Sequence, residues 1–161
     1  MSKKFGDDDN IKSLLMKLTF MKTIHVIGIN GSPRNQATQA VLEYGLDLAK
    51  QHSGVTTDQI NLREFDFKFC LHCNTCRDPE YFTKTGHFCV HNDDLEKVFP
   101  QVLEADSLIL ATPVYSGNPS GMLLSFMNRL HAIGPYMGKK RRTMQFIVVG
   151  ERRRRGMDTG R

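Results

Sequence analysis

The feature that most constrains the fold is an apolar stretch that runs into a turn and then into an amphipathic helix. Residues 23–29 are apolar and rich in β-branched side chains, which suits a strand covered on both faces in a parallel sheet. The turn at residues 30–33 follows, and over residues 38–50 apolar side chains recur at intervals of three and four. A strand, a glycine-containing turn and a helix in this order indicate the start of a βαβ unit.

The same alternation continues along the chain. We expect further strands near residues 55–62, 107–111 and 144–149, and helices over about 92–104 and 119–132. Strands that alternate with helical crossovers predict an α/β fold with a doubly wound parallel sheet. A complete flavodoxin-like sheet has five parallel strands, and only four are recognisable here. We therefore expect the last strand and helix to be absent, and the end of the chain to be truncated or frame-shifted.

With 161 residues the chain has the size of one ordinary domain. We divide it into an N-terminal extension (residues 1–20), one domain (residues 21–150) and a basic tail (residues 151–161). A cysteine-containing insertion occupies about residues 66–92 of the domain.

The formal net charge of +5 is unevenly distributed. Residues 139–161 contain nine Lys or Arg against two Asp or Glu, which leaves thirteen basic and fifteen acidic side chains in residues 1–138. A four-arginine run in such a tail is usually solvated, and no nucleic-acid-binding motif accompanies it, so we do not expect a nucleic-acid partner. No stretch is apolar enough for a membrane span or a signal peptide, so we expect a cytoplasmic protein.

Two loops follow predicted strands and are candidates for ligand binding. The first, residues 31–34, enters a helix, so its backbone N–H groups and the helix dipole favour a phosphate. It matches neither the dinucleotide nor the nucleoside-triphosphate fingerprint, and a plain strand-to-helix turn is the alternative. The second, residues 112–117, follows another strand, and ligands of open α/β sheets bind at the carboxyl ends of strands.

All four cysteines lie in one stretch. Cys70, Cys73 and Cys76 are close enough for one loop to hold three corners of a cubane cluster, and Cys89 is the candidate for the fourth. Zinc more often takes two separated Cys-x-x-Cys pairs, but a zinc site and a site without metal both stay open. Three histidines of the same stretch could substitute as ligands, although each is more often an ordinary loop residue: His72, His87 and His91.

The two loops and the residues between them resemble the branch of the flavodoxin-like superfamily that contains NADPH-dependent FMN reductases and iron–sulfur flavoproteins. The resemblance runs over residues 21–129. It rests on Gly31-Ser32-Pro33-Arg34 with Ala37-Thr38, on Thr112-Pro113-Val114-Tyr115 with Ser120-Gly121 and Asn128-Arg129, and on Gly86, Cys89 and Asp93-Asp94 between them.

The resemblance implies two cofactors. FMN would contact the first loop through Ser32, Pro33, Arg34, Ala37 and Thr38, with its phosphate on Ser32, Arg34 and Thr38. The second loop would hold the flavin ring through Thr112, Pro113, Val114, Tyr115, Ser116 and Gly117, where Tyr115 either lines the ring or only closes the end of the sheet. A [4Fe-4S] cluster would take Cys70, Cys73, Cys76 and Cys89 as ligands.

The function that follows is a cytoplasmic flavin-dependent oxidoreductase. Electrons would come from NAD(P)H or from a small carrier such as ferredoxin, and the family suggests a homo-oligomer. One alternative is a cluster-free NAD(P)H-dependent FMN or quinone reductase. Another, of a different class, is a zinc-stabilised or non-catalytic, truncated flavodoxin-like binding module.

Overall fold

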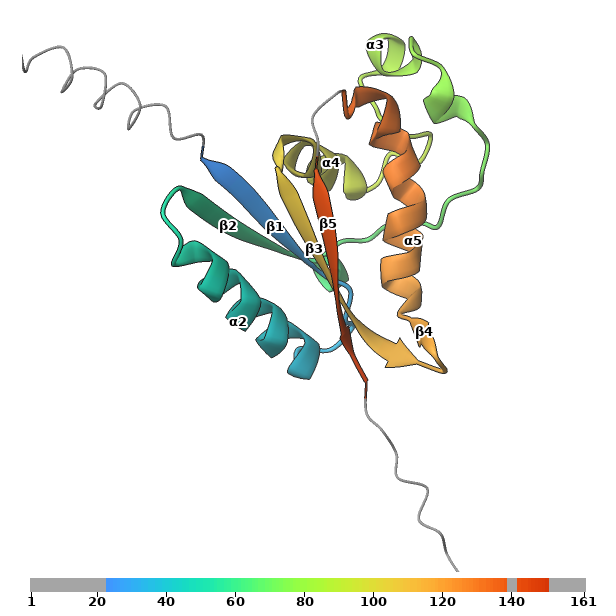
Figure 1. Cartoon of the computed structure of the whole chain (residues 1–161). Coiled ribbons are helices and arrows are strands. Elements are labelled where there is room, and N and C mark those ends of the chain that lie inside the picture. The colour runs from blue at the N-terminus through green and yellow to red at the C-terminus, as the bar shows by residue number, and fades with distance from the viewer. Residues whose placement is uncertain (1–22, 139–141, 151–161) are drawn as a thin grey trace, which may run out of the picture.

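The computed structural model describes residues 23–138 and 142–150. Its elements follow the predicted alternation of strands and helices (Figure 1). In chain order they are β1 (Ile24–Asn30), α2 (Ala37–Lys50), β2 (Val55–Asn61), η1 (Leu62–Glu64), η2 (Thr75–Arg77), α3 (Tyr81–Thr85), α4 (Leu95–Glu104), β3 (Ser107–Tyr115), β4 (Asn118–Pro119), α5 (Gly121–Arg129), η3 (Leu130–Tyr136) and β5 (Thr143–Val149).

Four parallel strands form the sheet, in the order β2-β1-β3-β5. The register pairs Ile24 with Val55, Val26 with Ser107, and Ser107 with Thr143. Because all four strands point the same way, their carboxyl ends meet at one edge of the sheet. The predicted doubly wound, flavodoxin-like α/β fold is therefore confirmed, and four parallel strands lie in the described part of the chain.

Helices cover both faces of the sheet (Figure 1). Alternate residues of β1 point to opposite faces, so Val26 packs beneath α2 while Ile27 and Ile29 belong to the larger core with α4 and α5. Gly28 lies where α2 approaches most closely, since a Cβ there would come within 2.7 Å of the side chain of Leu46. The absence of a side chain at this position lets the helix pack tightly on the sheet.

The loop after β3 differs from the sequence expectation. We predicted a strand that ends at residue 111, but β3 continues to Tyr115 and returns through a tight turn into the two-residue strand β4. Ser116 and Gly117 occupy the turn with positive φ values of 50° and 82°. The predicted helix over 119–132 is also divided, into α5 and the 3₁₀ segment η3.

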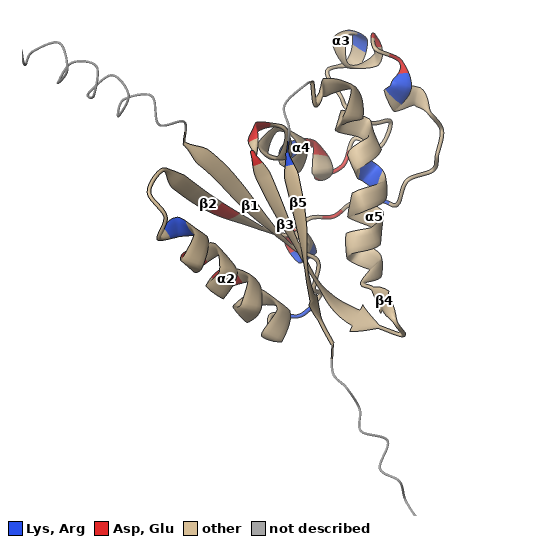
Figure 2. Cartoon of the chain, viewed as in Figure 1, with Lys and Arg blue, Asp and Glu red and all other residues tan. Residues whose placement is uncertain are grey.

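Within the described part of the chain, strand β5 pairs with β3 and lies at one edge of the sheet. Its inner residue Ile147 packs against the core beneath α2, but Met144, Phe146 and Val148 on the other face are 44%, 52% and 61% exposed. The helices on that face pack over β1 and β3 instead. Strands β3 and β5 contain no charged residue, whereas Figure 2 shows charged residues on β2, α2, α3, α4 and α5.

Two predicted regions lie outside the described residues, namely the N-terminal extension (residues 1–20) and the basic tail (residues 151–161). Within residues 23–138 and 142–150, no helix is both long and apolar enough to cross a membrane.

Candidate functional site

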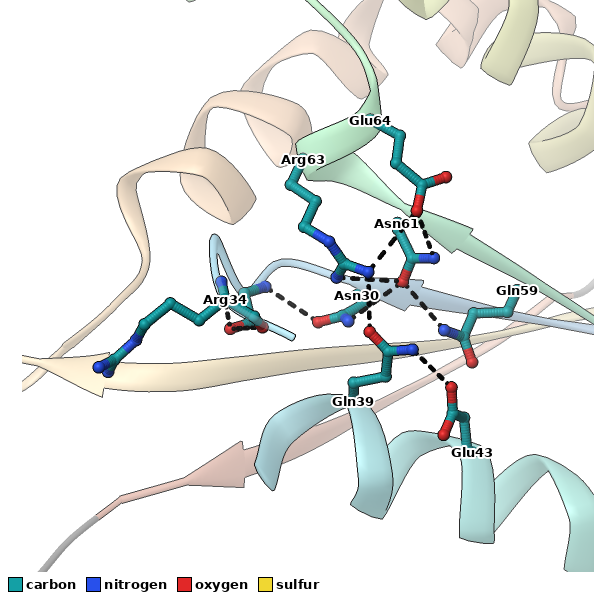
Figure 3. A network of polar contacts seen from close by, with 9 residues as sticks. Asn30, Arg34, Gln39, Glu43, Gln59, Asn61, Arg63 and Glu64 are labelled. Carbon is teal, nitrogen blue, oxygen red and sulfur yellow. Dashed lines mark hydrogen bonds and ion pairs between the residues drawn. The ribbon is translucent and has the colours of Figure 1, made fainter. Parts of the chain in front are cut away.

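The first loop is fixed at the point where β1 ends. Asn30 is fully buried there, its Oδ1 accepts a hydrogen bond from the backbone N–H of Ser32 at 3.0 Å, and its Nδ2 donates to Oδ1 of Asn61 at 3.2 Å (Figure 3). The N–H of Gly31 donates to the carbonyl of Ala111 on β3 at 2.8 Å. Neighbouring strands on both sides of β1 therefore hold this loop.

The polar contacts continue from Asn61 to the first turns of α2 (Figure 3). Arg63 donates to Oδ1 of Asn61 at 3.5 Å and to Oε1 of Gln39 at 2.8 Å, and Gln39 donates to Glu43 at 2.6 Å. This chain of side chains ties the end of β2 to the helix that begins at Ala37.

The loop itself turns around the side chain of Ser32. Its hydroxyl accepts from the N–H of Arg34 at 3.1 Å and donates to the carbonyl of Arg34 at 2.8 Å. Gly31 has no room for a side chain, because a Cβ would lie 2.7 Å from Cβ of Leu123. Ser32 therefore shapes the loop through its hydroxyl, and only glycine fits at the position before it.

The start of α2 is open to a ligand. Its N-cap residue, Gln36, makes no side-chain capping hydrogen bond, and the first N–H groups of a helix have no partner within the helix. A pocket of about 480 Å³ lies beside this helix end, within the size range of small-molecule sites. It is lined by Ser32, Arg34, Gln36, Ala37, Thr38, Pro113, Val114, Tyr115, Ser116 and Val149.

The pocket brings together eight of the eleven residues predicted to bind a flavin. Pro33, Thr112 and Gly117 do not line it, whereas Gln36 and Val149 do and were not predicted. Thr112 is buried, and its Oγ1 accepts from the N–H of Ser120 at 2.9 Å. The hydroxyl of Ser120 then donates to the carbonyl of Gly31 at 2.5 Å. Ser120 therefore joins the two loops, through its N–H to Thr112 and its hydroxyl to Gly31.

Arg34 and Tyr115 meet at the mouth of the pocket. The guanidinium donates to the phenol oxygen at 3.5 Å, and its central carbon lies 5.9 Å from the centre of the ring. Tyr115 is 37% exposed, so its ring presents apolar surface to the pocket while a positive charge lies beside it. An anionic group near α2 and a flat aromatic ring near Tyr115 would both find complementary surface here.

The cysteine segment leaves the sheet after η1 and returns before α4, and carboxylates hold it at both ends. Asp94 accepts from the N–H of Asp66 at 2.9 Å, and Asp93 accepts from the N–H of Lys68 at 3.1 Å. Nearer the cysteines, the carboxylate of Glu96 accepts from the N–H groups of Phe88 and Cys89. The ends of the segment are therefore held mainly by side-chain carboxylates, whereas the first loop is tied to the strands on both sides of β1.

All four cysteines are free thiols, and all four line one cavity of about 30 Å³. Burial raises the pKa of the Cys76 thiol, and the neighbouring Cys89, Cys73 and Cys70 raise it further. A hydrogen bond from Thr75 lowers the pKa of Cys73. The structure thus gathers the four predicted cysteines, which are separated by up to nineteen residues in the sequence.

The thiols are close but do not surround a single point. In the described part of the chain, no three Cys, His, Asp or Glu side chains form a group that could hold one metal ion. A cubane cluster does not need its ligands to surround one metal ion, because each of its four cysteines binds a separate iron. The cavity has room for about two water molecules, and Cys73 is the exposed thiol among the four that line it.

The histidines are divided between the cavity and its surroundings. His72 and His91 line the cavity, as does His131, which the sequence did not suggest, whereas His87 does not. Nε2 of His91 is buried without a hydrogen-bond partner.

Arg129 and Glu96 were not assigned a role from the sequence. Arg129 was named only as part of the family resemblance. In the structure it is almost fully buried, with 1% exposure. It bonds to Asp93 through both terminal nitrogens, at 2.7 and 3.1 Å. Burial alone would lower the pKa of Arg129, but its bonds to Asp93 and the nearby Cys89 outweigh this and raise it. Burial opposes the ionisation of Asp93, yet Arg129 holds the pKa of that carboxyl below its ordinary value.

Solved structures show that this fold is shared with flavin enzymes. An FMN-dependent NADH-azoreductase from Bacillus anthracis in complex with FMN aligns with a TM-score of 0.54 at 16% identity, over 78% of this chain and 69% of its own. An NAD(P)H:quinone oxidoreductase from Methanothermobacter marburgensis aligns with a TM-score of 0.52 at 14% identity, over 86% and 90%. At these identities the likeness concerns the fold.

Relatives found by sequence are more similar to this chain than these solved structures are. It is 36% identical over 130 residues to an iron–sulfur flavoprotein of Methanocaldococcus jannaschii, an alignment that covers 79% of this chain and 62% of the relative. The chain thus spans about three fifths of the length of that protein. The NADPH-dependent FMN reductase family matches residues 24–159, which extends beyond the 21–129 of the resemblance. This chain therefore belongs to the NADPH-dependent FMN reductase family.

Proposed function

We propose that this chain is a flavin-dependent oxidoreductase that binds FMN in the pocket between the start of α2 and the end of β3. The observation that carries the proposal is the position of Arg34. It lines the pocket beside the start of α2, where the N-cap residue makes no side-chain hydrogen bond, and its guanidinium contacts Tyr115. FMN has a phosphate at one end and a flat ring at the other, which matches these two surfaces. When bound, the flavin supplies the one- or two-electron chemistry.

The residues of the pocket have distinct tasks in this proposal. Arg34 and the first N–H groups of α2 bind the phosphate, together with the hydroxyl of Thr38. Pro113, Val114 and Tyr115 contact the ring and exclude water from it. Asn30 and Ser32 act indirectly, because their hydrogen bonds hold the loop in shape.

We further propose a [4Fe-4S] cluster on Cys70, Cys73, Cys76 and Cys89. Four free thiols that line one cavity, with the positive charge of Arg129 in its wall, are the donor set and charge that such a cluster prefers. The relative in M. jannaschii is named an iron–sulfur flavoprotein, which favours this ligand over zinc. A bound cluster supplies one-electron transfer.

In this scheme NAD(P)H or a small protein carrier such as ferredoxin delivers electrons, and the protein works as a homo-oligomer. The family name favours the nicotinamide as donor. The proteins of known structure that share the fold include enzymes named for NADH and for NAD(P)H.

The test is cofactor analysis of protein purified without oxygen. We expect about one FMN and about four irons with four acid-labile sulfides per chain. In Cys73→Ser the iron should be lost while FMN stays, and Thr83→Ser in the same segment serves as the matched control. Arg34→Ala should release FMN while the iron stays.

Other outcomes identify the alternatives. FMN without iron, bleached directly by NAD(P)H, would establish the cluster-free FMN or quinone reductase. One zinc per chain in a colourless protein would establish the zinc-stabilised, non-catalytic binding module and refute the proposal.

A further inference from the structure

Arg129 occupies an unusual position at the end of α5. Its side chain is 1% exposed, although an arginine is almost never fully buried without partners. Asp93 pairs with both of its terminal nitrogens, at 2.7 and 3.1 Å. The guanidinium and the carboxylate therefore form one buried ion pair next to the cysteine segment.

The same guanidinium also contacts both ends of that segment. Nη1 donates to the carbonyl of Lys68 at 2.8 Å, two residues before Cys70, and Nη2 lies 3.4 Å from the carbonyl of His91, two residues after Cys89. One side chain thus fixes the points at which the segment begins and ends.

The third nitrogen of the Arg129 guanidinium, Nε, has no hydrogen-bond partner. This nitrogen is buried, and Arg129 lines the cavity together with all four cysteines. A buried donor without a partner is costly, and such groups in native structures call for a ligand or a functional reason. The positively charged Arg129 side chain that carries this Nε thus forms part of the wall of the cavity that the four thiols line.

We propose that Arg129 is a positioning residue that fixes both ends of the cysteine segment and raises the reduction potential of the iron–sulfur cluster held there. The inference rests on the proposed function, because it requires a cluster on the four cysteines. Asp93 is the counter-charge that moderates the effect.

The physical reason is the change in charge on reduction. A cluster held by the four cysteines would become more negative by one unit on one-electron reduction, and a nearby fixed positive charge would stabilise the reduced form. Because Arg129 is buried, little solvent screens its charge from the cluster. An arginine on the surface would raise the reduction potential much less.

The test is a redox titration of the cluster, followed by electron paramagnetic resonance at one pH, so that the cavity histidines keep the same charge throughout. At the midpoint potential of the wild type, the ratio of reduced to oxidised cluster should fall at least about tenfold in Arg129→Met. For a one-electron couple this corresponds to a midpoint potential lower by about 59 mV. Arg129→Lys keeps the charge and should stay within about threefold of wild type. Asp93→Asn should shift the ratio the other way, upward, since it removes the counter-charge.

Arg142→Met is the matched control. Arg142 is also partly buried and donates to backbone carbonyls, of Leu103, Ala105 and Met137, but it does not line the cysteine cavity. Its loss should leave the potential unchanged. If Arg129→Met cannot be isolated with its cluster, the double variant Arg129→Met/Asp93→Asn leaves no unpaired buried charge and should still titrate below wild type.

Shifts of opposite sign in the two single variants would support the inference, because general destabilisation cannot produce them. A potential that is equal in wild type and in both charge-removing variants would overturn it while leaving the proposed function intact. Wild-type protein that contains no iron would overturn both.

Discussion

The two candidate sites of this molecule are held in place by different means. The loop that begins at Gly31 is bound to its neighbours by the sheet, through Asn30 on β1, Asn61 on β2 and the carbonyl of Ala111 on β3. The cysteine segment has no strand of its own. It is held by carboxylates and by the buried pair of Arg129 with Asp93.

A ligand pocket and a cysteine cavity that are held in these two ways should tolerate different kinds of substitution. A loop tied to both neighbouring strands, through the buried side chain of Asn30 and one backbone bond to Ala111, keeps its shape when a surface side chain is lost. A segment held by one buried ion pair should be less stable when either partner is removed.

The largest effect is expected from removing the carboxylate of the ion pair. Asp93→Ala leaves the guanidinium of Arg129 buried without its counter-charge, which costs about 3–5 kcal/mol in the free energy of unfolding. Urea unfolding measures it, and Asp58→Ala on the exposed edge of β2 is the control. A loss below about 1 kcal/mol would mean that the pair does not hold the segment.

Arg34→Ala should act on flavin binding and leave the fold alone. The proposed charge-assisted contact to phosphate is worth about 1.5–3 kcal/mol, so the Kd for FMN should rise about 10- to 150-fold. Fluorescence quenching of added FMN measures the Kd, with Lys84→Ala, an exposed residue of α3, as the control. An unchanged Kd would remove Arg34 from the site.

Gly31→Ala tests whether the first loop is as tightly packed as its hydrogen bonds imply. A Cβ at Gly31 would lie 2.7 Å from Cβ of Leu123 and 3.2 Å from the carbonyl of Ala111, and such overpacking costs about 1–3 kcal/mol. At Gly45, within α2, the nearest atom would be 3.8 Å away. Gly45→Ala should therefore stabilise the helix by up to about 1 kcal/mol. Equal effects of the two substitutions on thermal unfolding would contradict this account.

The smallest effect is expected in the dependence of stability on pH. Because the pKa of Asp93 is lower in the folded state, its contribution is fully present above the ordinary carboxyl pKa of about 3.9 and is lost as the pH falls through the lowered value. Asp93→Asn should flatten the acid limb of a stability curve measured from pH 5.5 to 3. Asp47→Asn, at an exposed position of α2, is the control, and a limb as steep as that of wild type in Asp93→Asn would assign the acid sensitivity to other carboxylates.

Much of the fold could be predicted because local patterns decide it. The β-branched run of β1 and the helical spacing of α2 identify these elements, and the structure confirms both to within a residue or two. The extension of β3 to Tyr115 could not be predicted, because Thr112-Pro113 resembles a turn in sequence and the pairing with β4 that continues the strand is a tertiary contact. The exposure of Phe146 likewise depends on where the helices pack.

In the candidate site, too, some features follow from local sequence and others from tertiary contacts. The parallel α/β order, the loop with Arg34 and the concentration of thiols between Cys70 and Cys89 could be predicted, because strand order, glycine turns and cysteine spacing are local properties. The contact of Tyr115 with Arg34, and the reach of Arg129 to Asp93 and the cysteine cavity, exist only in the folded chain. The physical reason is that burial and charge pairing depend on which distant segments pack together, and spacing along one chain does not encode that directly.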